Sequence, residues 1–198
     1  MARPSVEAER KEQILGGACE VLADVGFSAL RISDVAKRVG TSTGTVHYYF
    51  ATKRDLITAA FEWNFERSLA RRRHILDQHD DPHTELRAFV ESYLPTDEVT
   101  VQAWHVWAEL WVEGLHDPDL AALNERVYGE WRELVRRIIA DGQEAGQFRE
   151  GDATMFANGL IGLIDGLSVQ VLLKSKEMDV SRMREVCDQW LASLDVEQ

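Results

Sequence analysis

With 198 residues, of which 45 % are hydrophobic, the chain can bury the core of one large domain, or of a small and a medium one. Its start lacks the apolar run of a secretory signal, and its two cysteines lack the spacing of a zinc site or a disulfide framework, so a cytoplasmic protein is expected. The net charge of −12 is uneven, because residues 1–60 carry eight Lys and Arg against seven acids and residues 61–198 carry fourteen against twenty-seven. An acidic body leaves the N-terminal end most approachable to phosphate, unless the acids serve solubility alone.

Apolar residues recur at helical spacing along the whole chain, and only four prolines interrupt it. This pattern predicts an all-α fold of about nine helices, without strand-period segments or internal repeats. Residues 155–173 are the best membrane candidate, but Asp165 near their centre favours a buried helix, and no membrane partner is expected. The predicted helices cover residues 8–25, 33–39, 43–50, 53–78, 82–94, 97–114, 118–145, 152–175 and 180–194.

Residues 33–50 hold two short predicted helices joined by a turn that contains Gly40, an arrangement typical of a helix-turn-helix. Gly40 can adopt the left-handed conformation that ends a helix. Small and β-branched residues can pack between the two helices, and the second helix keeps a polar outer face. Such a face can enter the major groove of DNA, with short hydroxyl side chains at base edges and aromatic tips at phosphates. An ordinary helical hairpin is the alternative.

The pattern Ala36-x-x-x-Gly40-x-Ser42-x-Gly44-x-Val46-x-x-Tyr49-Phe50-x-x-Lys53-x-x-Leu56, preceded by Gly26-Phe27, resembles that of TetR-family repressors over about residues 10–60. The resemblance implies a three-helix DNA-binding domain over residues 1–56 and a helical regulatory, ligand-binding and dimerisation domain over residues 57–198. The tryptophans of residues 104–111 and the segment of residues 164–167 are similar to the choline-responsive BetI-like branch.

The same resemblance implies roles in DNA binding for the matching positions. Thr43, Gly44 and Thr45 would approach bases, and Tyr49 and Lys53 would contact phosphates. Many family members have Tyr where this chain has His47. At the start of the preceding helix, a serine is expected to cap that helix and meet a phosphate, and two arginines, Arg3 and Arg31, are further candidates. The predicted DNA-binding residues are Ser33, Thr43, Gly44, Thr45, His47, Tyr48, Tyr49 and Lys53.

Tryptophans gather in the body, where three of them share one predicted helix face. Core packing explains such a stripe, but the family's ligand cavity lies in this region, and Asp165 inside an apolar run needs a partner, a proton or a wet cavity. The effector is then either an organic cation, such as a quaternary ammonium or a polyamine, held by aromatic faces, or a neutral or lipid-like molecule. The predicted effector-binding residues are Trp63, Trp104, Trp107, Trp111, Trp131, Asn158 and Asp165.

Three glycines recur every three or four residues in the penultimate predicted helix, where each costs about 0.8–1 kcal/mol of helix propensity. Close helix packing would compensate for this cost. Family members pair two C-terminal helices with those of a second copy, so Gly159, Gly162, Gly166 and Trp190 are predicted at a dimer interface. Packing within one chain is the alternative.

Taken together, the resemblance implies a homodimeric repressor whose partners are a pseudo-palindromic double-stranded DNA operator and a small-molecule effector. No cofactor or metal is expected, since Pro82 breaks the helical geometry between His79 and His83. Two rival classes are an all-α enzyme that uses Asp165, Glu109 or His105, and a helical adaptor that does not bind DNA. The first lacks a recognisable catalytic constellation, and the polar recognition helix argues against the second.

Overall fold

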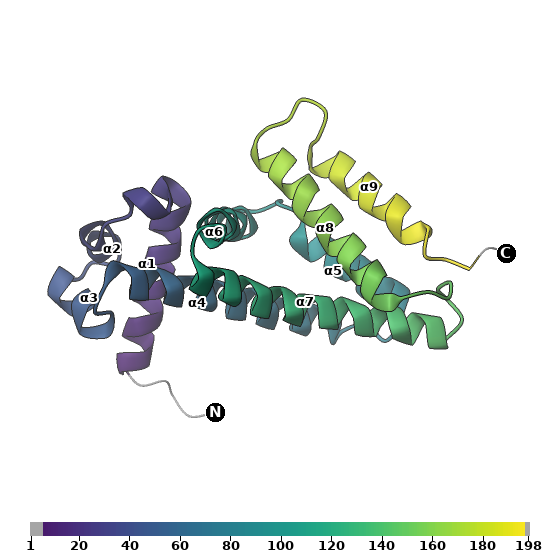
Figure 1. Ribbon diagram of the computed structural model, residues 1–198, viewed down its shortest axis with the longest axis horizontal. Helices are drawn as coiled ribbons and strands as arrows, with labels where there is room; N and C mark the ends of the chain where they lie inside the picture. The colour runs from purple at the N-terminus through teal and green to yellow at the C-terminus, as the bar shows by residue number, and fades with distance from the viewer. Residues whose placement is uncertain (1–5, 197–198) are drawn as a thin grey trace. The chain divides into compact units, whose positions relative to one another are not determined.

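The computed structural model describes residues 6–196, so Arg3 lies outside the described residues. The all-α prediction is confirmed, and each predicted helix is present with bounds that differ by a few residues at most. The described part of the chain contains the helices (Figure 1) α1 Val6–Ala29, α2 Ile32–Arg38, α3 Thr43–Tyr49, α4 Lys53–Leu76, α5 Pro82–Tyr93, α6 Glu98–Gly114, α7 Pro118–Glu144, α8 Ala153–Leu172 and α9 Val180–Ala192.

Contacts divide the described chain into two compact units. Unit 1 contains the residues up to Ser68 together with Gln102–Asn124, and unit 2 contains Leu69–Val101 together with the residues from Glu125 onward. Helices α4, α6 and α7 each continue from one unit into the other. The predicted domain boundary after residue 56 falls within α4, and it stays a prediction.

In unit 1, α1, α2 and α3 pack against one another around an apolar core (Figure 1). The first helix is interrupted at Gly26, whose φ of 78° is left-handed, as its predicted role as a helix stop requires. Near the middle of α1, Gly17 lets α2 approach so closely that a Cβ added there would clash with the Val39 Cγ1 atom. These two glycines fix how α1 meets α2.

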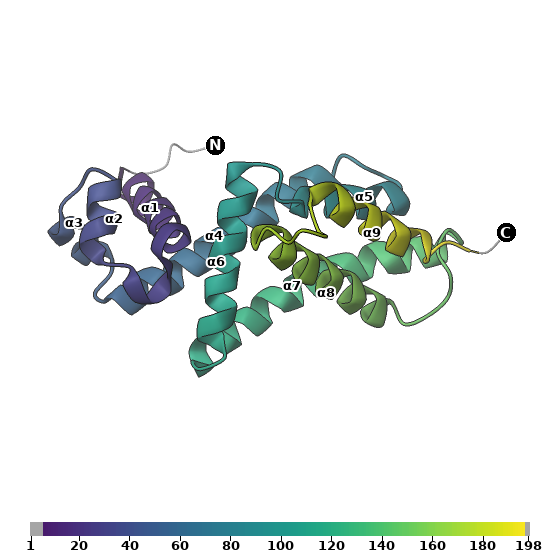
Figure 2. The same ribbon diagram turned by 90° about the horizontal axis from the view of Figure 1, so that it is seen from above.

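In unit 2, α8 and α9 lie side by side and run in opposite directions (Figures 1 and 2), and α9 also packs on α5. Arg184 of α9 donates two hydrogen bonds to the Glu91 carboxylate of α5, at 2.6 and 3.1 Å. Aspartates cap α5, α8 and α9, as at Asp152, whose side chain accepts from two backbone N–H groups. By length and composition α8 could cross a membrane, but so can helices whose apolar surface packs on protein, and a third of its apolar window is buried.

Candidate functional site

Two features hold helix α3 in place: one fully buried side chain, and a hydrogen-bonded cap at its N-terminus. Val46 has no exposed surface. Ser42 accepts a hydrogen bond from the Thr45 N–H at 3.0 Å, which satisfies a donor that the first turn of the helix would otherwise leave free. Gly40, with a φ of 65°, ends α2 and turns the chain into this cap. The two short helices and their turn thus have the helix-turn-helix arrangement that the spacing predicts.

Most of the predicted DNA-binding side chains of α3 lie on its outer face. Thr43, Gly44 and His47 are exposed, and Tyr48 is 74 % exposed. Tyr49 is half-buried and meets the Tyr48 ring edge-on, with centroids 5.0 Å apart. This face is polar and uncovered, which a groove-binding helix requires.

Two threonines of this helix differ in what their hydroxyl groups do. Thr45 is half-buried, and its Oγ1 atom lies 2.9 Å from the Ser42 Oγ atom, so part of its hydrogen-bonding capacity is used within the turn. Thr43 is exposed. Thr43 is therefore the better placed of the two to read a base edge.

The predicted capping role of Ser33 is wrong. Helix α2 begins one residue earlier, at Ile32, so its N-cap is Arg31, which makes no side-chain cap hydrogen bond. Ser33 is the exposed second residue of the helix. Only its predicted phosphate contact remains.

Lys53, the predicted phosphate contact, is already engaged within unit 1. Its ammonium donates to the Ser28 carbonyl oxygen at 3.0 Å and lies 5.5 Å from the centroid of the Phe27 ring. From the other side, the Glu109 carboxylate of α6 accepts from the Phe27 N–H at 2.6 Å. The last turn of α1, which follows the break at Gly26, is thus held by an ammonium and by a carboxylate, neither of which the sequence linked to it.

Sequence reasoning also missed Lys11. A pocket of about 580 Å³ brings this lysine of α1 together with Tyr48 and Tyr49 of α3, and Glu7 and Ala8 complete its lining. The Lys11 ammonium lies 5.9 Å from the Phe50 ring centroid. Nothing in the local sequence around a lysine of the first helix reveals that folding places it beside the third.

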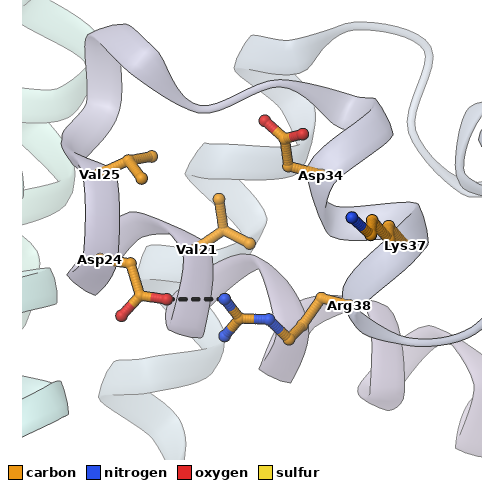
Figure 3. Close-up of a pocket in the computed structure, with 6 residues that line it drawn as sticks. All are labelled: Val21, Asp24, Val25, Asp34, Lys37 and Arg38. Atoms are coloured by element: carbon orange, nitrogen blue, oxygen red, sulfur yellow. Dashed lines mark hydrogen bonds and ion pairs between the residues drawn. The ribbon is translucent and has the colours of Figure 1, made fainter.

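A second pocket, of about 470 Å³, lies between α1 and α2 (Figure 3). Arg38 spans this junction by donating to Asp24 at 2.6 Å and to Glu20 at 3.0 Å, and these bonds raise the pKa of its guanidinium. The pocket holds two acidic and two basic side chains, so it does not favour a ligand of either charge. The ion pairs of Arg38 instead orient α2 on α1. The lining residues are Val21, Asp24, Val25, Asp34, Lys37 and Arg38.

Four of the predicted effector residues belong to unit 1. Trp104 and Trp111 meet edge-on with centroids 6.1 Å apart, whereas Trp107 meets Phe65 at 6.4 Å. Trp63 lies under the Arg67 guanidinium at 4.6 Å. Trp104 and Trp107 are buried. Their part in binding an effector stays a prediction.

The other predicted effector residues belong to unit 2. The Tyr128 hydroxyl donates to the Asp165 carboxylate at 2.5 Å. Burial raises the pKa of Asp165 to about 6, although the Tyr128 hydrogen bond lowers it in part. Trp131 is buried against Tyr93, with ring centroids 5.6 Å apart. Asn158, in contrast, is exposed, and its side-chain oxygen accepts from Arg132 at 2.8 Å.

The predicted interface glycines of α8 divide into two kinds. A Cβ on Gly159 would lie 3.4 Å from the Trp190 ring of the same chain, so these two residues pack within the protomer. Gly162 and Gly166 are exposed, and an added Cβ would meet nothing within 4 Å. Helix α8 therefore presents a flat surface of small residues, and its exposed ends carry Met155 and Leu173.

Two family models and several relatives match this chain. The model described as "BetI-type transcriptional repressor, C-terminal" matches residues 82–196, and the one described as "Bacterial regulatory proteins, tetR family" matches residues 14–60. An HTH-type transcriptional regulator BetI from Stenotrophomonas maltophilia is 27 % identical over 191 residues, with 94 % of this chain and 93 % of that protein covered. A BetI 1 regulator from Chromohalobacter salexigens is 28 % identical over 189 residues, covering 94 % of this chain and 90 % of that protein.

A solved structure is more similar still. It is a putative transcriptional regulator from Saccharomonospora viridis in complex with choline, 33 % identical, with a TM-score of 0.90 over 96 % of this chain and 99 % of that one. A TetR-family regulator from Rhodococcus sp., at 24 % identity and a TM-score of 0.84 over 95 % and 99 % of the two chains, shares the fold. The chain belongs to the TetR family of bacterial transcriptional regulators, with a BetI-type C-terminal domain, and is not an enzyme.

Proposed function

We propose that this regulator is a homodimeric repressor that binds a pseudo-palindromic operator in the cytoplasm and changes its affinity for DNA when a small organic cation binds to unit 2. The observation that carries the DNA-binding part is the polar outer face of α3, which is exposed above a buried Val46. A second DNA-binding domain is needed, since one short recognition helix contacts few base pairs. The rival interpretation as an adaptor without DNA binding gives no reason for this uncovered polar helix.

Base contacts are assigned to the exposed start of α3, chiefly Thr43, with Gly44 allowing the backbone to approach. Phosphate contacts are assigned to Lys11, Tyr49 and Lys53, and also to Ser33 and His47 at the edges of the same surface. A phosphate seated between Lys11 and the two tyrosine hydroxyl groups would use the pocket between α1 and α3.

The test begins with selection of the preferred site from random duplexes, followed by gel shifts. Thr43→Ala should alter the sequence preference, with about 1–3 kcal/mol of discrimination lost at one base pair in each half-site. Lys11→Ala should weaken binding to all duplexes alike, and Lys176→Ala, an equal loss of charge at an exposed site of unit 2, should leave it unchanged. If Thr43→Ala and Lys11→Ala both bind like the parent, the assignment of this surface is wrong.

The dimer is assigned to the exposed face of α8. This helix is apolar, yet only a third of its apolar window is buried in the protomer. Gly162 and Gly166 would let the same helix of a second copy approach closely. Both Gly162→Leu and Gly166→Leu should yield monomers in light scattering and abolish tight operator binding, whereas Gly129→Leu, at an equally open glycine of α7, should leave a dimer. A stable monomer of the unmodified chain at micromolar concentration would exclude this assembly.

The effector is assigned to an organic cation because the solved relative from Saccharomonospora viridis was crystallised with choline. In unit 2, the ring of Trp131 and the Asp165 carboxylate supply a π face and a negative charge, which suit a quaternary ammonium. With a pKa of about 6, Asp165 is mostly ionised at pH 7.5. Choline titrations followed by tryptophan fluorescence should show weaker binding at pH 5 than at pH 7.5 in the parent, and no such difference in Asp165→Asn.

A neutral isostere separates the cation from a plain hydrophobic effector. 3,3-Dimethylbutanol has the shape of choline without its charge, and it should bind much more weakly. Equal binding of the two, together with an unchanged choline affinity in Asp165→Asn, would assign Asp165 a structural role and exclude a cation-selective site.

A further inference from the structure

One arginine of unit 2 is buried on aromatic rings. Arg72, near the end of α4, is 2 % exposed. Its guanidinium carbon lies 3.5 Å from the centroid of the Tyr93 ring and 5.5 Å from that of Trp131. One of its terminal N–H groups donates to the Ser92 carbonyl oxygen at 3.0 Å. The guanidinium is therefore held face-on against a ring, in the position that a bound organic cation would take.

These two rings and that of Phe89 contact one another, and the three residues Phe89, Tyr93 and Trp131 are here called the aromatic box. Their centroids are 4.9 Å apart for Phe89 and Tyr93, 5.6 Å for Tyr93 and Trp131, and 6.3 Å for Phe89 and Trp131. All three are buried, with 1 %, 8 % and 5 % of their surface exposed, respectively. Because the box is shielded from water, its faces attract a cation more strongly than exposed rings do.

The Arg72 guanidinium carries its full positive charge at neutral pH. Burial lowers the pKa of Arg72 to about 10, while the neighbouring Tyr93 acts in the opposite direction. The guanidinium thus remains protonated at neutral pH, and a second cation on the same face would meet both its bulk and its repulsion. The face of Tyr93 can hold either Arg72 or a ligand, but not both.

We propose that Arg72 is a tethered occupant of the aromatic box in the effector-free protein, and that an organic-cation effector binds by taking its place on Tyr93. The second half of this proposal rests on the proposed function, in which the effector is an organic cation. The tether sets effector affinity, because the measured dissociation constant is the intrinsic one divided by the fraction of protein with an open box. Effector binding must then release the side chain of a residue of α4, the helix that begins at Lys53.

The first test removes the charge and keeps most of the chain length. With the competitor gone, Arg72→Met should bind choline about tenfold more tightly than the parent, or better. Arg73→Met removes the same charge from the exposed side of the same turn and should change choline affinity less than about twofold, since an exposed charge is screened. Weaker choline binding by Arg72→Met would show that Arg72 helps to hold the effector, and would overturn the proposal.

A second test measures thermal stability, and this measurement needs neither choline nor DNA. Arg72→Ala leaves a space above Tyr93, which ethylguanidinium should fill, raising the melting temperature of this variant but not that of the parent. If the folded variant gains nothing from ethylguanidinium, the box does not select a cation and the proposal fails. If it does gain while choline leaves the operator affinity of the parent unchanged, the proposed effector is wrong but the tethered occupant stands.

A measurement on the unmodified protein covers the case in which both variants fail to fold. A guanidinium stacked on Tyr93 has its Nε–H proton shifted upfield by the ring current. The proposal expects saturating choline to remove this shift from the Arg72 signal, whereas an unchanged shift in the choline complex would overturn it.

Discussion

Helix α3 and the aromatic box differ in where they keep their polar groups. On α3, most of the predicted DNA-binding side chains are exposed, and a single buried valine anchors the helix. In unit 2, Arg72 is buried on aromatic rings, and the half-buried Asp165 carboxylate accepts a hydrogen bond from Tyr128. Exposed groups can change without cost to the fold, whereas buried charges link ligand binding to stability and to pH.

The largest effect that sharpens this contrast is expected at Asp165. Its pKa is raised to about 6 in the folded protein, above the usual value of 3.8, because burial disfavours its charge. A group with a raised pKa stabilises the fold fully below its unfolded pKa, and this stabilisation is lost as the pH rises through the folded pKa. Stability should therefore fall between about pH 4 and pH 6 by up to about 3 kcal/mol, the equivalent of about two pKa units.

Urea unfolding at a series of pH values checks this prediction. Asp165→Asn should remove this part of the pH dependence and be at least as stable as the parent at pH 7.5. Tyr128→Phe should steepen the dependence, since its hydroxyl stabilises the ionised carboxylate. Parallel pH profiles of the parent and Asp165→Asn would contradict the raised pKa.

The contrast also explains what the sequence could predict. The helices and the turn at Gly40 follow from local patterns, and the residues of α3 lie together because they are neighbours in one short segment. The aromatic box is assembled from α5 and α7, and Arg72 reaches it from α4. Of its residues, the sequence indicated only Trp131, because a buried arginine and two rings among many cannot be paired without tertiary packing.

Within single segments, the structure refines the predictions in detail. Ser33 is a favourable capping residue, but the helix begins one residue earlier, so its side chain is inside the first turn. Thr45 is predicted to approach bases, and this stays a prediction, while its hydroxyl also lies 2.9 Å from that of Ser42. In both cases the residue type was informative and its exact position in the turn was not.

The next largest effect is expected at Gly17, where α1 and α2 pack too closely to accept a side chain. Gly17→Val places a branched side chain against Val39, and such overpacking costs about 1–3 kcal/mol. Operator binding should weaken with it, because α2 is displaced from α1. Gly129→Ala, at a helical glycine with open space, should be neutral or stabilise by at most about 1 kcal/mol. Thermal unfolding of both variants tests this, and equal stability of Gly17→Val and the parent would mean that α2 does not pack so closely.

A smaller effect is expected at Lys53, whose ammonium is bonded within unit 1 and is also assigned a phosphate contact. Lys53→Ala should reduce the slope of log affinity against log salt by about one, the value for one phosphate contact. It should also lower stability by no more than about 1 kcal/mol, because the lost hydrogen bond to Ser28 is exposed. Filter binding at several salt concentrations measures the slope, and an unchanged slope would show that the ammonium stays on Ser28 and Phe27 in the complex.

The smallest effect is expected at Glu109, whose charge is neither fully exposed like the side chains of α3 nor fully buried like Arg72. Its half-buried carboxylate accepts from the Phe27 N–H at 2.6 Å and holds the turn beside Lys53. Glu109→Gln keeps an acceptor but removes its charge, so the bond should weaken by about 1 kcal/mol. This weakening should appear as about fivefold faster hydrogen exchange of the Phe27 amide, with amides in the middle of α1 unaffected. Glu113→Gln, one turn further along α6, makes the same substitution and should leave the exchange unchanged. If Glu109→Gln and Glu113→Gln exchange alike at Phe27, the carboxylate does not hold the turn, and Lys53 alone positions it.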